Sequence, residues 1–109
     1  MVFKAKLTKR DIKEISAEFK KTLAKAGIQV DDLILFGSYA AGKPHAWSDI
    51  DLCVVSRQFG KNDFDDMAKL SKLGKQVSYL IESHPINPKD LKRGIHPLAE
   101  EIKRTGKKI

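Results

Sequence analysis

Cysteine is almost absent from this sequence, since Cys53 is the only one in 109 residues. A lone cysteine cannot form a disulfide within the chain, so we expect a reducing, cytoplasmic compartment. Long apolar runs are missing too, because no stretch approaches the ~20 residues of a membrane-spanning helix. The start, MVFKAKLTKR, has no apolar signal-peptide segment. These absences exclude a disulfide-bonded scaffold and a membrane span, and they predict a soluble protein.

Aromatic residues are few, at 7%, and they do not alternate with basic residues as a base-stacking surface requires. The net charge of +7 comes from the two ends. Residues 1–27 hold eight Lys and Arg against three acids, and residues 89–109 hold seven against three. Residues 28–88 hold six against eight, a net of −2. This distribution argues against direct nucleic-acid binding and favours solvated helix faces or contact with an acidic partner.

Apolar periodicity and turn residues predict one small α+β domain over residues 1–109, with helices packed on a mixed sheet of three or four strands. Thr8 and Asp11 resemble a capping box at the start of the first helix, and Gly74 is expected to end the second. The strand 49–56 is apolar in its inner half, which is typical of a central strand. The expected helices lie between Thr8 and Gly27, over 63–73 and from Pro97 to Gly106, with short turns at 38–43 and from Pro88; the expected strands are 32–36, 49–56 and 75–83.

The stretch GSYAAGKPHAWSDIDL, residues 37–52, begins like a P-loop, because Gly37 to Lys43 fits G-x-x-x-x-G-K. A P-loop needs Ser or Thr after the lysine to bind Mg²⁺, but Pro44 stands there. Proline has no hydroxyl and no backbone N–H for the phosphate cradle, so the P-loop interpretation fails. Lys43 stays a candidate nucleotide contact, as a point charge facing a triphosphate, beside the alternative of a solvated loop lysine.

The second half of this stretch places two carboxylates two residues apart. In a strand, Asp49 and Asp51 project from one face while the apolar residues between and after them enter the core. Paired carboxylates repel each other unless a cation lies between them, and Mg²⁺ prefers oxygen ligands and bridges carboxylates to substrate phosphates. Gly37 allows close approach of a phosphate, and Ser38 adds a hydroxyl and an N–H. The stretch therefore predicts a joint metal and phosphate site.

Gly-Ser, ten further residues and Asp-x-Asp resemble the signature of the DNA polymerase β-type nucleotidyltransferase superfamily. The short chain and the form Ser-Asp-Ile-Asp-Leu are most similar to its minimal nucleotidyltransferase branch. The resemblance implies a polymerase β-like fold and transfer of a nucleoside monophosphate, here expected as AMP from ATP, to an acceptor hydroxyl with two Mg²⁺ ions. Asp49 and Asp51 would bind both metals. Gly37 and Ser38 would contact the β- and γ-phosphates.

The superfamily normally carries a third acid on a neighbouring strand. On the expected strand 75–83, Gln76, Ser78, Leu80 and Glu82 share a face, and Glu82 is its only acid. IESHPI resembles the context in which small members carry this residue, so Glu82 is the candidate third catalytic and metal-binding carboxylate, beside the alternative of a solvent-facing glutamate. Ser78 stands where an aspartate is otherwise expected, which leaves weak transfer as an alternative.

The resemblance also suggests a partner. Minimal nucleotidyltransferases act as antitoxins beside a helical HEPN-type toxin, which some of them adenylylate, so a protein acceptor is expected. The alternative is a catalytically weak nucleotide-binding module that neutralises its partner by masking it. A homo-oligomer through an exposed edge strand is a further possibility. His84 and His96 each stand alone near a proline without metal-ligand spacing, so we interpret them as structural.

Overall fold

A computed structural model of the chain describes residues 6–46 and 48–109. Its elements, in order, are α1 (Lys9–Lys25), β1 (Asp32–Phe36), α2 (Gly37–Ala40), β2 (Ile50–Val55), α3 (Asp63–Val77), β3 (Ile81–Ile86), α4 (Pro88–Arg93), α5 (Ala99–Thr105) and β4 (Lys107–Lys108). Within these residues the sheet has four strands in the order β3–β2–β1–β4. β2 and β3 are parallel, and the other two pairs are antiparallel. The predicted α+β fold with a mixed sheet is confirmed.

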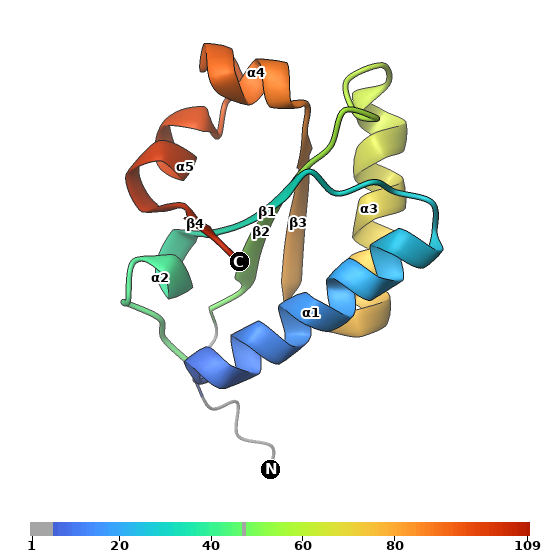
Figure 1. Cartoon of the computed structure of the whole chain (residues 1–109). Coiled ribbons are helices and arrows are strands. Elements are labelled where there is room, and N and C mark those ends of the chain that lie inside the picture. The colour runs from blue at the N-terminus through green and yellow to red at the C-terminus, as the bar shows by residue number, and fades with distance from the viewer. Residues whose placement is uncertain (1–5, 47) are drawn as a thin grey trace.

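Side chains of β2 alternate between two apolar layers, one on each face of the sheet. Ile50 and Leu52 are fully buried in the layer that includes Phe19 of α1 and Leu70 of α3. Cys53 and its neighbours on the opposite face pack with Ile102 of α5. Figure 1 shows α3 and α5 on opposite sides of the strands. Because alternate residues of a strand share a face, Asp51 projects on the α5 side.

The first helix begins and ends as its sequence predicts. The Asp11 N–H donates to the Thr8 hydroxyl at 3.0 Å, and the Thr8 N–H donates to the Asp11 carboxylate at 2.8 Å, which completes a capping box. Two hydrogen bonds with Thr8 hold the pKa of Asp11 below its ordinary value. The buried residues Phe19 and Leu23 then anchor α1 on the sheet.

The predicted boundary between the second helix and the third strand is wrong. α3 continues through Gly74 to Val77, and β3 starts only at Ile81. Gly74 is buried, and a Cβ there would lie 3.0 Å from the Ile81 Cγ2 atom, so the missing side chain lets helix and strand pack closely. Packing therefore overrides the helix-ending tendency of glycine. Ser78 caps α3, its N–H donating to the Gly74 carbonyl at 3.0 Å, and it lies outside β3.

The last helix ends at Gly106 as predicted, but the chain then adds the short edge strand β4, which was not predicted. Lys107 and Lys108 pair with β1, and the Lys108 ammonium lies 3.6 Å from the Asp32 carboxylate. Two lysines carry no strand pattern in the sequence, so the pairing depends on the neighbouring strand. In the described parts of the chain, no helix has both the length and the apolar character needed to cross a membrane.

Candidate active site

Strand pairing brings three parts of the predicted site together around Asp51. Asp51 lies opposite Phe36, the last residue of β1, and opposite Glu82 on β3. Gly37 follows Phe36 directly, so the Gly-Ser turn starts beside the Asp51 carboxylate. Residues paired in register project from the same face of the sheet, which puts Glu82 and Asp51 on the α5 side together.

Gly37 is in direct contact with Asp51 and has no room for a side chain. Its φ of +75° lies in the left-handed region, and a Cβ atom at this position would collide with the Asp51 carboxylate. The Gly37 carbonyl accepts from the Ala41 N–H at 3.0 Å, and this bond closes the turn of α2. The Gly37 N–H donates to the Thr105 hydroxyl of α5 at 3.3 Å. The turn is thus held from both sides.

Asp49 is exposed directly before β2, and two residues that precede it, His45 and Ser48, are joined by hydrogen bonds. Ser48 is 4% exposed, and its hydroxyl accepts from the His45 N–H at 2.8 Å. The Ser48 N–H donates in turn to the His45 carbonyl at 3.0 Å. This reciprocal pair holds Ser48 next to Asp49, the residue that precedes β2.

The electrostatics of this end of the sheet favour a cation. Burial, followed by the nearby charges of Asp49, Glu101 and Glu82, raises the pKa of Asp51 from 3.8 to about 6. Across 6–46 and 48–109, no three His, Cys, Asp or Glu side chains are gathered closely enough to hold a metal ion. Mg²⁺ commonly uses one or two carboxylates and completes its shell with water and substrate phosphates. The carboxylates present fit such an open site.

Helix α5 contributes two residues that the sequence did not indicate. Glu101 lies near enough to Asp51 to affect its pKa, and Thr105 binds the Gly37 N–H. The Thr105 hydroxyl donates to the Glu101 carbonyl at 3.0 Å. In the sequence, Glu101 and Thr105 are related only by their i, i+4 spacing on one side of α5. That spacing does not predict a contact with the distant Gly-Ser turn.

Other predicted residues lie around this centre in different settings. Glu82 is exposed, and Ser38 is half-buried in the first turn of α2. Lys43 is exposed beyond α2, and its backbone N–H donates to the Ser38 carbonyl at 3.0 Å. The structure therefore places Gly37 against Asp51 and pairs Asp51 with Glu82 across β2 and β3. Lys43 lies beyond the end of α2.

His84 lies two residues after Glu82 on the same face of β3. Its ring packs at a tilt on Phe36, with the ring centroids 5.5 Å apart. Burial lowers the pKa of His84, although the neighbouring Glu82 opposes that shift. A half-buried ring packed against an aromatic residue fits the structural role that the sequence suggested.

The model of the nucleotidyltransferase domain family matches residues 12–105, which include every residue of the centre just described. The chain belongs to the nucleotidyltransferase domain family. No curated protein sequence matches the chain at a significant level.

Solved structures share the nucleotidyltransferase fold. A proposed nucleotidyltransferase from Sulfolobus solfataricus, solved at 1.40 Å, superposes with a TM-score of 0.60 and 22% identity over 73% of this chain and 70% of that one. A toxin–antitoxin structure with AMP-PNP superposes with a TM-score of 0.60 and 24% identity, over 84% of this chain and 69% of that one. A mutant MntA–HpeT toxin–antitoxin structure superposes with a TM-score of 0.59 and 21% identity, over 84% of this chain and 69% of that one. At these identities the likeness establishes the fold.

Within this nucleotidyltransferase domain, the position of Ser78 changes one sequence argument. Ser78 was expected on the third strand, where it would have occupied the place of an acid. It instead caps α3, and its hydroxyl accepts from the Leu80 N–H at 3.2 Å. Glu82 is the β3 residue opposite Asp51. The apparent loss of an acid at Ser78 was therefore a consequence of the misplaced strand.

Proposed function

We propose that this nucleotidyltransferase domain moves AMP from ATP to an acceptor hydroxyl in a Mg²⁺-dependent reaction. The supporting observation is the register around Asp51, which has the end of β1 on one side and Glu82 on the other. A glycine turn for phosphates and carboxylates for cations thus meet at one end of the sheet. Phosphoryl transfer needs mainly positioning and charge stabilisation, which such an arrangement supplies.

Each residue has a definite role in this proposal. Asp49 and Asp51 would hold two Mg²⁺ ions, and Glu82, opposite Asp51 on β3, would be the third carboxylate once the ions draw the acids together. When bound, the ions supply charge stabilisation at the attacking and leaving oxygens. Gly37 and Ser38 contact the β- and γ-phosphates, because the backbone of Gly37 is free of a side chain that would keep phosphate away. Lys43, exposed beyond the turn, adds a positive point charge for the triphosphate.

The transfer is a single in-line displacement at the α-phosphorus. The acceptor oxygen forms a bond to this phosphorus, while the bond from phosphorus to the bridging oxygen breaks and pyrophosphate leaves. The hydroxyl proton passes to the Glu82 carboxylate, which is solvent-exposed on the Asp51 face and therefore reachable by an acceptor. The two aspartates would have to be ionised to hold the cations.

Calorimetric titration of ATP tests the location of the nucleotide site. Wild type should bind ATP with Mg²⁺ and lose binding in EDTA, and Asp49→Ala/Asp51→Ala should not bind under either condition. Asp63→Ala/Asp65→Ala is the matched control, since these exposed acids have the same spacing on α3. Equal Mg²⁺-dependent binding by wild type and the Asp49/Asp51 variant would refute the proposed site.

A protein is the acceptor that we propose, specifically a helical HEPN-type toxin, with this chain as its antitoxin. The fold shared with toxin–antitoxin structures supports this choice. The outer face of α3 also exposes large apolar side chains, with Phe64 at 81% and Met67 at 42%. Because Phe64 and Met67 lie one helical turn apart, they form a small exposed apolar surface that a protein partner could cover. Mass spectrometry of the purified partner after incubation with ATP and Mg²⁺ should detect added AMP on a hydroxyl side chain.

Masking of the partner without chemistry is the alternative hypothesis. Two features of the sequence suggested it, the absence of a second domain and Ser78 in the place of an acid. The structure places Ser78 in the α3 cap and outside β3. The Asp49→Ala/Asp51→Ala variant separates the two functions: under the transfer proposal it binds the partner without modifying or silencing it. Silencing of the partner by this variant would establish masking in place of transfer.

A further inference from the structure

A hollow lies at the end of the sheet opposite the carboxylates. It measures about 280 Å³ and is bounded by the loop after β2 and by the start of α4. Its described lining residues are Arg57, Phe59, Gly60, Lys61, Asn87, Lys89, Asp90 and Arg93, which we call the basic cleft. The residues assigned to nucleotide transfer take no part in its lining.

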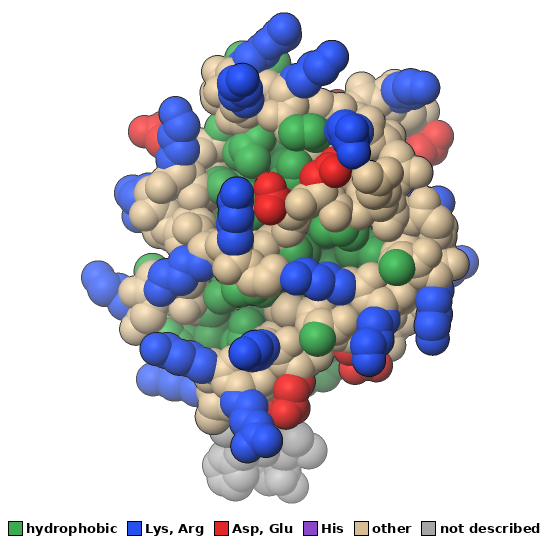
Figure 2. Space-filling model, in the orientation of Figure 1, with side chains coloured by type: hydrophobic (Ala, Val, Ile, Leu, Met, Phe, Trp, Pro, Cys, Tyr) green, Lys and Arg blue, Asp and Glu red, His purple; other side chains and the backbone are tan. Residues whose placement is uncertain are grey.

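The basic cleft gathers positive charge from the loop after β2 and from α4. Four of its described lining residues are Lys or Arg, and Asp90 is the single acid among them. Like charges brought together in a hollow repel one another, and a bound anion would relieve that repulsion. Figure 2 shows basic side chains over α4 at the top of the view. Asp31 partly neutralises Arg57, but the surplus of positive charge in the lining still favours an anionic ligand.

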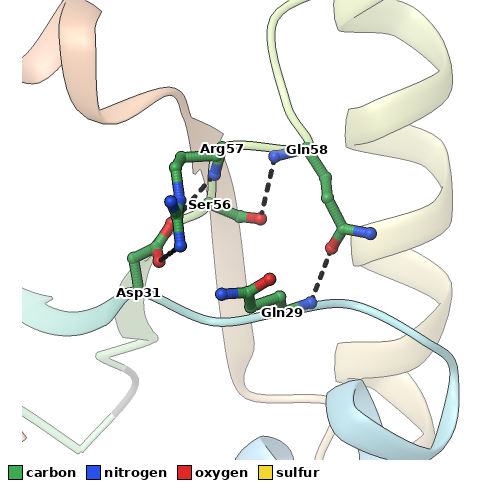
Figure 3. A network of polar contacts seen from close by, with 5 residues as sticks. All are labelled: Gln29, Asp31, Ser56, Arg57 and Gln58. Atoms are coloured by element: carbon green, nitrogen blue, oxygen red, sulfur yellow. Dashed lines mark hydrogen bonds and ion pairs between the residues drawn. The ribbon is translucent and has the colours of Figure 1, made fainter.

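One side of the cleft is fixed by the polar contacts in Figure 3. The Arg57 guanidinium lies 3.4 Å from the Asp31 carboxylate, which also accepts the Arg57 N–H at 2.9 Å. The Gln58 side chain accepts from the Gln29 N–H at 2.6 Å (Figure 3). It also donates to the Gly27 carbonyl at 3.1 Å. The loop that carries Arg57 is thus tied to the segment before β1. A guanidinium held in place loses less conformational freedom when it binds a ligand.

The opposite side is fixed by Asn87, the residue that precedes α4. Its side chain donates to the Phe59 carbonyl at 2.8 Å and accepts from the Lys89 N–H at 2.9 Å. The Gly60 N–H donates to the Asp66 carboxylate at 3.0 Å, which ties the floor of the cleft to α3. Both sides of the cleft therefore have set positions relative to each other.

From this arrangement we propose that the basic cleft binds a phosphate group. Guanidinium and ammonium groups together recognise phosphate by charge and by hydrogen bonds. A hollow of this volume fits a compact tetrahedral anion better than an extended acidic peptide. The six-residue strands β2 and β3 separate it from Asp51 by roughly 17–20 Å. The bound phosphate is therefore distinct from the triphosphate in the transfer reaction, and the proposal does not depend on that reaction.

The test is an NMR titration of the ¹⁵N-labelled chain with inorganic phosphate, against acetate at the same ionic strength. Phosphate should shift the amides of Lys61 and Lys89 saturably, and acetate should not. Lys89→Gln/Arg93→Gln should weaken the affinity about tenfold or more, because charge-assisted hydrogen bonds are lost. Neither side chain is buried, so the fold tolerates the changes.

Lys92→Gln/Lys103→Gln is the matched control, since it removes the same charge from exposed positions outside the cleft. The same titration with a ten-nucleotide adenylate RNA separates the sources of phosphate. RNA binding that the cleft variant weakens identifies a nucleic-acid backbone, whereas shifts with inorganic phosphate alone identify a small phosphorylated molecule. Absent shifts, equal shifts with acetate, or an equal loss in the control variant would overturn the proposal.

Discussion

At the scale of single residues, the site depends on a glycine that touches a carboxylate. Gly37 has φ +75°, and a Cβ on it would collide with Asp51. Gly42 has a similar φ of +72° five residues later, but a Cβ there would meet open space among the described residues. Comparing the two glycines therefore distinguishes the effect of backbone strain, which both positions share, from the effect of steric contact, which only Gly37 has.

Gly37→Ala should therefore lose more stability than Gly42→Ala. Both carry the cost of a left-handed alanine, about 1–2 kcal/mol, but only Gly37→Ala also displaces the Asp51 carboxylate. Urea unfolding gives the two free energies of unfolding, and calorimetry with Mg²⁺ and ATP should show binding retained by Gly42→Ala alone. Equal effects of the two substitutions would mean that the contact with Asp51 has no functional weight.

Asp51 also predicts how the stability of the metal-free chain changes with pH. Its pKa is about 6 in the folded chain against an ordinary 3.8, so between these values the folded state binds more protons than the unfolded state. The free energy of unfolding contributed by this group therefore falls as pH rises from about 4 through 6. Asp51→Asn removes the charge. The thermal midpoint of this variant should therefore exceed that of wild type by a margin that grows as the pH rises.

Thermal unfolding in EDTA from pH 4 to pH 8 measures this margin. It should be smallest near pH 4 and reach a few degrees above pH 7, because a half-buried carboxylate is partly screened by solvent. Added Mg²⁺ should raise the wild-type midpoint and leave Asp51→Asn unchanged. A margin that stays constant with pH would contradict the raised pKa.

At the scale of elements, α5 connects the end of the chain to the Gly-Ser turn. The Thr105 hydroxyl accepts the Gly37 N–H and donates to the Glu101 carbonyl. Thr105→Val keeps the shape of the side chain and removes both bonds. We expect Mg²⁺-dependent ATP binding to weaken about fivefold, the equivalent of about 1 kcal/mol for one hydrogen bond.

Thr105→Ser is the conservative control, because serine keeps the hydroxyl. Calorimetry should give Thr105→Ser the same affinity for ATP as wild type. Thermal midpoints should show that wild type, Thr105→Val and Thr105→Ser are all folded. If serine weakens binding as much as valine does, the methyl packing of Thr105 matters and the hydroxyl does not. That result would remove α5 from the positioning of Gly37.

The elements also show what the sequence can and cannot predict. The capping box of α1 and the alternation around Asp51 are local patterns, and both appear in the structure as expected. The end of α3 was mispredicted because Gly74 lies inside the helix, where it packs closely against Ile81 of β3. Glu101, β4 and the basic cleft depend on parts of the chain that meet only after folding. Local periodicity holds no information about such meetings.

At the scale of the whole molecule, the sheet carries opposite charges at its two ends. Acids surround Asp51 at one end, and the basic cleft lies at the other, beyond the last residues of β2 and β3. A strand length of roughly 17–20 Å exceeds the distance over which neighbouring sites usually couple. The two ends should therefore bind their ligands independently.

Independent binding predicts that stabilisation by Mg²⁺ and by inorganic phosphate is additive. At about one hundred times its Kd, each ligand should raise the free energy of unfolding by about 2.7 kcal/mol, and both together by the sum within about 0.5 kcal/mol. Urea unfolding at constant ionic strength measures all four conditions. Asp49→Ala/Asp51→Ala should lose the Mg²⁺ part alone, and Lys89→Gln/Arg93→Gln the phosphate part alone. Stabilisation by phosphate that requires Mg²⁺ and both aspartates would instead put the anion at the carboxylate end.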